Sequence, residues 1–123
     1  MIRVVRLGSP RARGEGLRLG TVRRPPRGVK KSDYARRSYY DVWLPELSPS
    51  PRLIALAHRD WGSFTKGYRR EMKAPAAERL LELLARLSHD ADFSMGCYCE
   101  REDRCHRSIL KQLLREKEAK LAA

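Results

Sequence analysis

The chain has 123 residues, which is enough for a single domain with its own hydrophobic core. Its 27 Lys and Arg against 15 Asp and Glu give a formal net charge of +12, and no apolar run approaches the roughly 18 residues of a membrane span. These features exclude a membrane-spanning helix. The N-terminal stretch lacks the apolar core of a signal peptide, so we expect a cytoplasmic protein.

Short apolar and β-branched runs predict four strands. Residues 2–7 form the first run, and residues 17–24 alternate in polarity until two prolines stop them. Residues 39–44 are rich in aromatic and β-branched side chains and end at Pro45. The fourth strand is expected at residues 91–97.

Apolar residues at helical spacing predict four helices, at residues 51–58, 61–72, 76–88 and 104–120. Ser50 is a candidate N-cap of the first helix, with Pro51 at its first position. The second helix carries an aromatic stripe, which we interpret as core rather than as a ligand box. The stripe consists of Trp61, Phe64, Tyr68 and Met72.

The order of these elements predicts the fold class. Strands come first, helices dominate the middle, and a strand followed by a helix closes the chain. We expect one α/β domain over residues 1–123, with a small, mostly parallel sheet flanked by helices in two or three layers.

Residues with side-chain amides are rare in this chain. The chain has no Asn and a single Gln, whereas 34 % of its residues are charged. This balance is typical of thermophile proteins. Because the interiors of hyperthermophile cells tolerate disulfides, we do not assume that the cysteines are reduced.

The positive charge is concentrated near the N-terminus. Residues 1–40 hold twelve Lys and Arg against two acidic residues, an excess of +10, whereas the remaining 83 residues carry only +2. A localised basic face predicts an anionic partner, either nucleic acid or a phosphate-bearing small molecule; the alternative is a solubilising surface. Five basic residues interrupted by Pro-Pro and Gly are the candidate anion-binding loop: Arg23, Arg24, Arg27, Lys30 and Lys31.

All three cysteines lie in residues 96–107, between the last predicted strand and the last predicted helix. With Asp103 as N-cap, the first turn of that helix would hold Arg104, Cys105 and His106, followed by Arg107. Unpaired backbone N–H groups and the helix dipole make such a position an anion site. The same position should lower the thiol pKa of Cys105. We therefore predict Arg104 and Arg107 as anion ligands, and Cys105 and His106 as candidate nucleophile and general acid or base.

Three other interpretations of this loop remain open. Cys97, Cys99, Cys105 and His106 have the ligand types of a zinc site, although the Cys-x-Cys spacing and the adjacent Cys-His pair do not favour a metal. Cys99 and Cys105 are candidates for a disulfide. The cysteines are otherwise small buried groups in a helix-capping loop. Neither a Walker nor a Rossmann fingerprint occurs, and His58 and His89 are expected at the surface.

Several stretches resemble the domain-of-unknown-function family numbered 488. They are the 22–29 segment around Pro25-Pro26, the 47–50 Pro-Ser turn, the Trp61-x-x-Phe64-x-x-x-Tyr68 helix, and Cys97 with the Cys105-His106-Arg107 tripeptide. The resemblance spans roughly residues 17–115. It implies a compact α/β domain whose matching residues gather in one cleft, and it implies no particular reaction.

Two functional hypotheses follow. In the first, a cleft between residues 23–31 and 96–107 binds a phosphate-bearing ligand, on which Cys105 or His106 acts. In the second, the protein is a non-catalytic nucleic-acid-binding module, with Tyr34, Tyr39 and Tyr40 available for stacking on bases.

Overall fold

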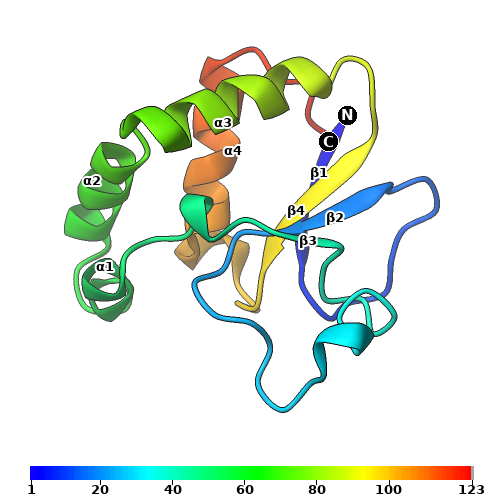
Figure 1. Ribbon diagram of the computed structural model, residues 1–123. Coiled ribbons are helices and arrows are strands. Elements are labelled where there is room, and N and C mark those ends of the chain that lie inside the picture. The colour runs from blue at the N-terminus through cyan, green and yellow to red at the C-terminus, as the bar shows by residue number, and fades with distance from the viewer. Residues whose placement is uncertain (123) are drawn as a thin grey trace.

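A computed structural model describes residues 1–122 and contains a four-stranded sheet (Figure 1). The strands are β1 (Ile2–Arg6), β2 (Leu17–Gly20), β3 (Val42–Trp43) and β4 (Phe93–Cys97). Their order is β1-β4-β2-β3 and every pairing is parallel, so the predicted α/β class with a parallel sheet is confirmed. The five residues of β4 are all buried, as expected for the strand that lies between two others.

Four helices gather on one face of this sheet (Figure 1). They are α1 (Pro51–Leu56), α2 (Trp61–Glu71), α3 (Pro75–Leu87) and α4 (His106–Glu116). Single 3-10 turns occur at η1 (Lys31–Asp33), η2 (Pro45–Leu47) and η3 (Glu102–Arg104). Among the residues described, no helix combines the length and the apolar character needed to cross a membrane.

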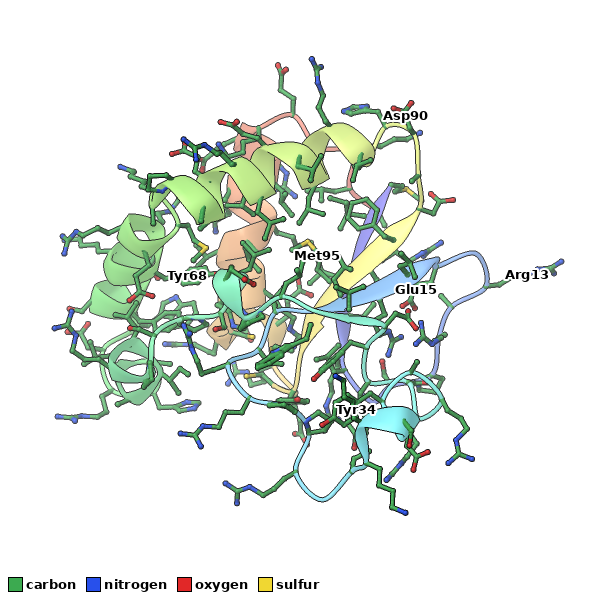
Figure 2. The ribbon with its side chains drawn as sticks, in the orientation of Figure 1. Arg13, Glu15, Tyr34, Tyr68, Asp90 and Met95 are labelled. Atoms are coloured by element: carbon green, nitrogen blue, oxygen red, sulfur yellow. The ribbon has the colours of Figure 1, made fainter. Side chains whose placement is uncertain are left out.

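The main core fills the space between the helices and the sheet. Because side chains alternate along a strand, Leu19 and Met95 face the helices, and Figure 2 shows Met95 and Tyr68 in this space. The aromatic stripe of α2 belongs to the core as predicted, with Phe64 stacked between Trp61 and Tyr68 at ring-centroid distances of 5.0 and 6.0 Å.

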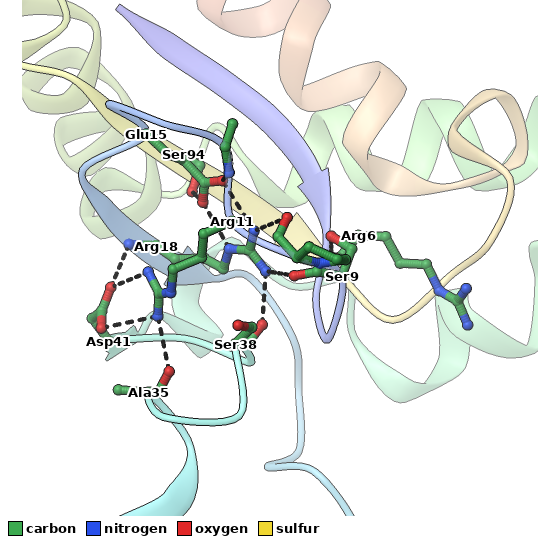
Figure 3. Close-up of polar contacts among 11 residues, drawn as sticks. Arg6, Ser9, Arg11, Glu15, Arg18, Ala35, Ser38, Asp41 and Ser94 are labelled. Carbon is green, nitrogen blue, oxygen red and sulfur yellow. Dashed lines mark hydrogen bonds and ion pairs between the residues drawn. The ribbon is translucent and has the colours of Figure 1, made fainter.

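Loops cover the opposite face of the sheet, around a buried ion pair (Figure 3). Glu15 and Arg18 are 2 % and 0 % exposed. The Arg18 guanidinium donates to both carboxylate oxygens of Glu15, at 2.7 and 3.0 Å, and to backbone carbonyls of Ser9, Pro10 and Ser38. The pair therefore ties two loops to β2, and the charge of Arg18 is not part of the exposed basic face.

Several predicted boundaries are wrong. The third strand is only Val42–Trp43 instead of residues 39–44, and the last helix ends at Glu116 instead of residue 120. Two other differences have local reasons. The second strand ends at Gly20 instead of residue 24, because the chain leaves the sheet at Thr21, whose side chain turns to Gly96 and His106. The last helix begins at His106, so Asp103 is not its N-cap. Asp103 instead lies in η3 and pairs with Arg101 at 2.7 Å.

Ser50 does precede α1, with Pro51 at the first helical position, but its side chain makes no capping bond. Its backbone N–H donates instead to the Glu71 carboxylate at 2.9 Å, which connects the start of α1 to the end of α2.

Candidate functional site

The site lies where two neighbouring parallel strands end. β4 ends at Cys97 and β2 ends just before Thr21, and parallel strands present their carboxyl ends at the same edge of a sheet. The first turn of α4 begins at His106 beside them. Residues that are far apart in the sequence are therefore brought together by the sheet register.

The three cysteine sulfurs form one cluster, lying within 4.8 Å of one another. Cys97 and Cys105 are buried, with their sulfurs 2.7 Å apart, and Cys99 is exposed. The backbone N–H of Cys99 donates to the Cys97 sulfur at 3.4 Å. All three are free thiols, so the Cys99–Cys105 disulfide, one of the alternatives left open by the sequence, is not formed.

His106 is held as a neutral ring in one orientation. Its Nε2 lies 2.8 Å from the Thr21 carbonyl, which accepts its proton, and the ring packs edge-to-face on Tyr68 at 5.5 Å. Nδ1 is then an acceptor, 3.6 Å from the Cys105 sulfur. Burial lowers the pKa of His106 to about 4, so the ring is uncharged at neutral pH.

Sequence reasoning missed Thr21, which is fully buried. Its hydroxyl donates to the Gly96 carbonyl at 3.0 Å and lies 3.0 Å from Nε2 of His106. A threonine followed by a valine is typical of an ordinary strand, so no local sequence pattern identifies Thr21 as a site residue.

Arg107 supplies a buried positive charge behind the cysteines. It is 4 % exposed and donates to the Cys99 carbonyl at 2.7 Å. Its Nε–H has no hydrogen-bond partner within residues 1–122. Within this part of the chain, the fold therefore leaves one N–H donor of the Arg107 guanidinium without an acceptor.

Negative charge in the cluster is favoured at Cys99. Hydrogen bonds from Cys105 and Cys97, followed by the positive charge of Arg107, hold the pKa of the Cys99 thiol well below its usual range. The hydrogen bond to Cys105 raises the pKa of Cys97. The predicted lowering of the Cys105 pKa is wrong in direction: its hydrogen bond with Cys97 lowers the pKa, but the one with Cys99 and its burial outweigh this and raise it.

A cavity of about 450 Å³ opens beside the thiol cluster. Cys99 and Arg24 contribute an exposed thiol and an exposed guanidinium to it. Most of the remaining lining is apolar. The full lining is Val22, Arg23, Arg24, Ser48, Pro49, Pro51, Ile54, Cys97, Tyr98, Cys99 and His106.

The structure brings two members of the predicted basic loop to this cavity. Arg23 donates to the backbone carbonyls of Ser48 and Pro49 at 3.2–3.4 Å, and so joins the loop to the segment before α1. Arg24 makes no side-chain hydrogen bond or ion pair to residues 1–122.

The other predicted anion ligands lie elsewhere. Arg27 lines a second cavity and Lys31 a third, and Lys30 is exposed outside all of them. Arg104 lies over the Trp61 ring, 5.9 Å from its centroid. Arg107 is behind the cysteines instead of in the cavity wall. Anion binding by any of these residues stays a prediction, as does catalysis by Cys105 and His106.

One protein-family model matches this chain. It is described as the active DUF488-N3 subclade, and the match covers residues 2–118, from the first strand to the end of the last helix. No match is found among curated proteins or among solved structures.

Proposed function

This chain belongs to the DUF488 family, and we propose that its cleft binds a phosphate-bearing ligand of the nucleotide type. The observation that carries the proposal is the composition of the 450 Å³ cavity, in which apolar walls stand next to an exposed arginine and an exposed thiol. Apolar lining with a few convergent polar groups is the usual character of a small-molecule site.

The two halves of a nucleotide match the two parts of this cavity. Val22, Pro49 and Ile54 give an apolar surface for a base. Arg24 extends from the same wall without a carboxylate partner within residues 1–122, and guanidinium groups bind phosphate through paired hydrogen bonds. Arg23 lines the cavity while bound to backbone carbonyls, so its contribution is to hold the wall and to add positive charge.

Cys99 is the thiol that a ligand in this cavity would meet. It is exposed, whereas Cys105 is buried beneath it. The thiolate is the nucleophilic form of cysteine, and hydrogen bonds from Cys105 and Cys97, with the charge of Arg107, favour that form at Cys99. For any reaction that the protein catalyses, we assign Cys99 as the nucleophile. Cys105, His106 and Arg107 then hold the thiol cluster in position.

Binding of nucleoside mono- and triphosphates, measured by calorimetry, tests the proposal. Arg24→Ala should weaken binding about tenfold or more, because a hydrogen bond to a charged group contributes roughly 1.5–3 kcal/mol. Arg13→Ala is the matched control, since Arg13 extends into solvent from a distant loop (Figure 2). Equal affinities of the two variants would contradict the proposed site, and Cys99→Ser should abolish any turnover without abolishing binding.

A structural zinc site is the second candidate, favoured by the clustering of three sulfurs within 4.8 Å. The Nε2–H of His106 is directed to a backbone carbonyl, which leaves Nδ1 as an acceptor near Cys105. Histidine ligands of metals commonly have this arrangement. Tetrahedral zinc with Zn–S bonds of roughly 2.3 Å holds its sulfurs about 3.8 Å apart, so Cys97 and Cys105 would have to separate.

Metal analysis and thiol titration of the same sample separate the two candidates. One equivalent of zinc, with thiols that become reactive only after chelation, would establish the metal site and remove Cys99 as a nucleophile. Absence of metal with one fast-reacting thiol, identified as Cys99 by mass spectrometry, is the result expected for the ligand-binding cleft.

A further inference from the structure

A second cavity, of about 660 Å³, adjoins the first. The two cavities share Arg24 and Tyr98 in their linings. The Tyr98 hydroxyl donates to the Arg24 carbonyl at 2.9 Å, which fixes the wall between them. The rest of the second cavity is lined by Pro25, Pro26, Arg27 and Tyr39.

Aromatic rings face this second cavity. Tyr39 and Tyr98 contact each other edge-to-face, with ring centroids 6.3 Å apart. Both are only partly buried, so ring surface remains available to a ligand. Tyrosine rings at the surface are the usual stacking platforms for unpaired bases. The apolar walls of the first cavity offer a similar surface for packing against a base, so each cavity can accept one base.

The surroundings of the second cavity are strongly basic. Arg24 and Arg27 lie in its wall, and the structure gives neither guanidinium a carboxylate partner within residues 1–122. Arg37 lies 5.9 Å from the Tyr39 ring centroid. Arg6 donates to the Tyr98 carbonyl at 3.3 Å and pairs with the exposed Glu100 at 3.6 Å.

We propose that the two cavities together bind a single-stranded nucleic acid. One nucleotide enters the first cavity beside Cys99, its neighbour stacks on Tyr39 in the second, and the phosphate that joins them lies at Arg24. This inference rests on the proposed function and deepens it, because it names a polynucleotide strand instead of a free nucleotide as the ligand. Charge complementarity supports this occupant: a polyanion matches four arginines around an aromatic cavity.

Fluorescence anisotropy with a short single-stranded oligonucleotide, compared with a labelled mononucleotide, tests the inference. The oligonucleotide should bind at least tenfold more tightly. Tyr39→Leu keeps apolar packing but removes the stacking ring, and should weaken oligonucleotide binding by about 5- to 150-fold while leaving mononucleotide binding unchanged. Tyr39→Phe should retain the affinity.

The salt dependence of oligonucleotide binding gives a second test, and this test does not depend on the packing of Tyr39. Arg27→Ala changes an exposed side chain and should reduce the slope of log K against log salt by about 0.7, the value for one lost contact to a single strand. Arg13→Ala, on the distant loop, should leave both the slope and the affinity unchanged.

The outcomes distinguish this inference from the proposed function. Equal affinities for mononucleotide and oligonucleotide, or no effect of Tyr39→Leu and Arg27→Ala on the oligonucleotide, would overturn the inference and leave the nucleotide cleft intact. Failure of both ligands to bind would overturn both proposals.

Discussion

Replacing Glu15 with glutamine removes the negative partner of a fully buried arginine. The Glu15 carboxylate accepts four hydrogen bonds: two from Arg18, one from the Ala12 N–H at 3.0 Å and one from the Ser94 hydroxyl at 2.5 Å (Figure 3). The substitution leaves the Arg18 charge in place, with only neutral acceptors around it: the backbone carbonyls of Ser9, Pro10 and Ser38 and the amide oxygen of the new glutamine.

Two independent arguments give the same magnitude for this change. Breaking a buried ion pair by removing one partner costs about 3–5 kcal/mol. Burial raises the pKa of Glu15, but hydrogen bonds from Arg18 and Ser94 outweigh it and lower that pKa from 4.5 to about 2. At 1.36 kcal/mol per pH unit, this corresponds to about 3 kcal/mol. We therefore expect Glu15→Gln to lower the free energy of unfolding by about 3 kcal/mol at pH 7.

The pH dependence follows from the sign of the shift. Because the folded-state pKa of Glu15 is lowered, its stabilisation is fully present above about pH 4.5 and is lost as the pH falls toward 2. Urea unfolding at pH 7 and at pH 3 should show the difference between wild type and Glu15→Gln shrinking at the lower pH.

Asp33→Asn is the matched control for this experiment. Asp33 and Arg36 form an ion pair with the same i,i+3 spacing, but the Arg36 side chain is 76 % exposed. Exposed pairs contribute roughly 0–1 kcal/mol, so little stability should be lost. A loss below about 1 kcal/mol for Glu15→Gln as well, or a loss that does not change between pH 7 and pH 3, would refute the reasoning.

Three further predictions concern the site and its supports. Alkylation by iodoacetamide should be fastest at Cys99 and should persist at pH 6, because its pKa is lowered, whereas Cys97 and Cys105 should react only on unfolding; peptide mapping that finds Cys105 labelled first would contradict this. Thr21→Val should cost about 1 kcal/mol in urea unfolding, since the Thr21 hydroxyl bonds to Gly96 and lies beside His106; an unchanged midpoint would contradict it. Gly16→Ala should prevent folding, because the added Cβ collides with the Asp92 carbonyl, whereas Gly14→Ala, with a similar positive φ but open space, should cost only about 1–2 kcal/mol; equal losses in thermal unfolding would contradict the collision.

Much of the fold could be predicted from the sequence, because apolar periodicity records which face of each element is buried. The stripe from Trp61 to Met72 identifies α2 and its buried face, and the apolar run that ends at Cys97 identifies β4. Boundaries that depend on tertiary contacts were predicted less well. Asp103 has the side chain of an N-cap, but a neighbouring arginine pairs with it and α4 starts three residues later.

The position of the candidate site was also predictable, since it requires only that a strand end where a helix begins. The roles of individual residues within it were not. Local spacing places Cys105 at a helix N-terminus, but it does not indicate that Cys105 is buried beneath Cys99 or that its pKa is raised. The match to the family model confirms the resemblance read from the Cys-His-Arg tripeptide.

The count of basic residues along the sequence overstated the exposed basic face, because it included arginines that are paired within the fold. Arg18 belongs to the basic N-terminal segment by sequence, yet it is fully buried against Glu15. Arg11 is likewise paired with Asp41, at 2.9 Å. A count along the chain does not separate arginines that organise loops from those, such as Arg24, that remain available to a ligand.

Protection of Cys99 from alkylation by nucleoside phosphates tests the central claim most directly, because thiol and ligand must then share one cavity. Wild type and Arg24→Ala would be labelled with iodoacetamide in the presence of increasing nucleoside mono- and triphosphates. We predict that ligand slows the labelling of Cys99 in wild type and that Arg24→Ala weakens this protection. Unchanged labelling of Cys99 at every ligand concentration would contradict the proposed cleft.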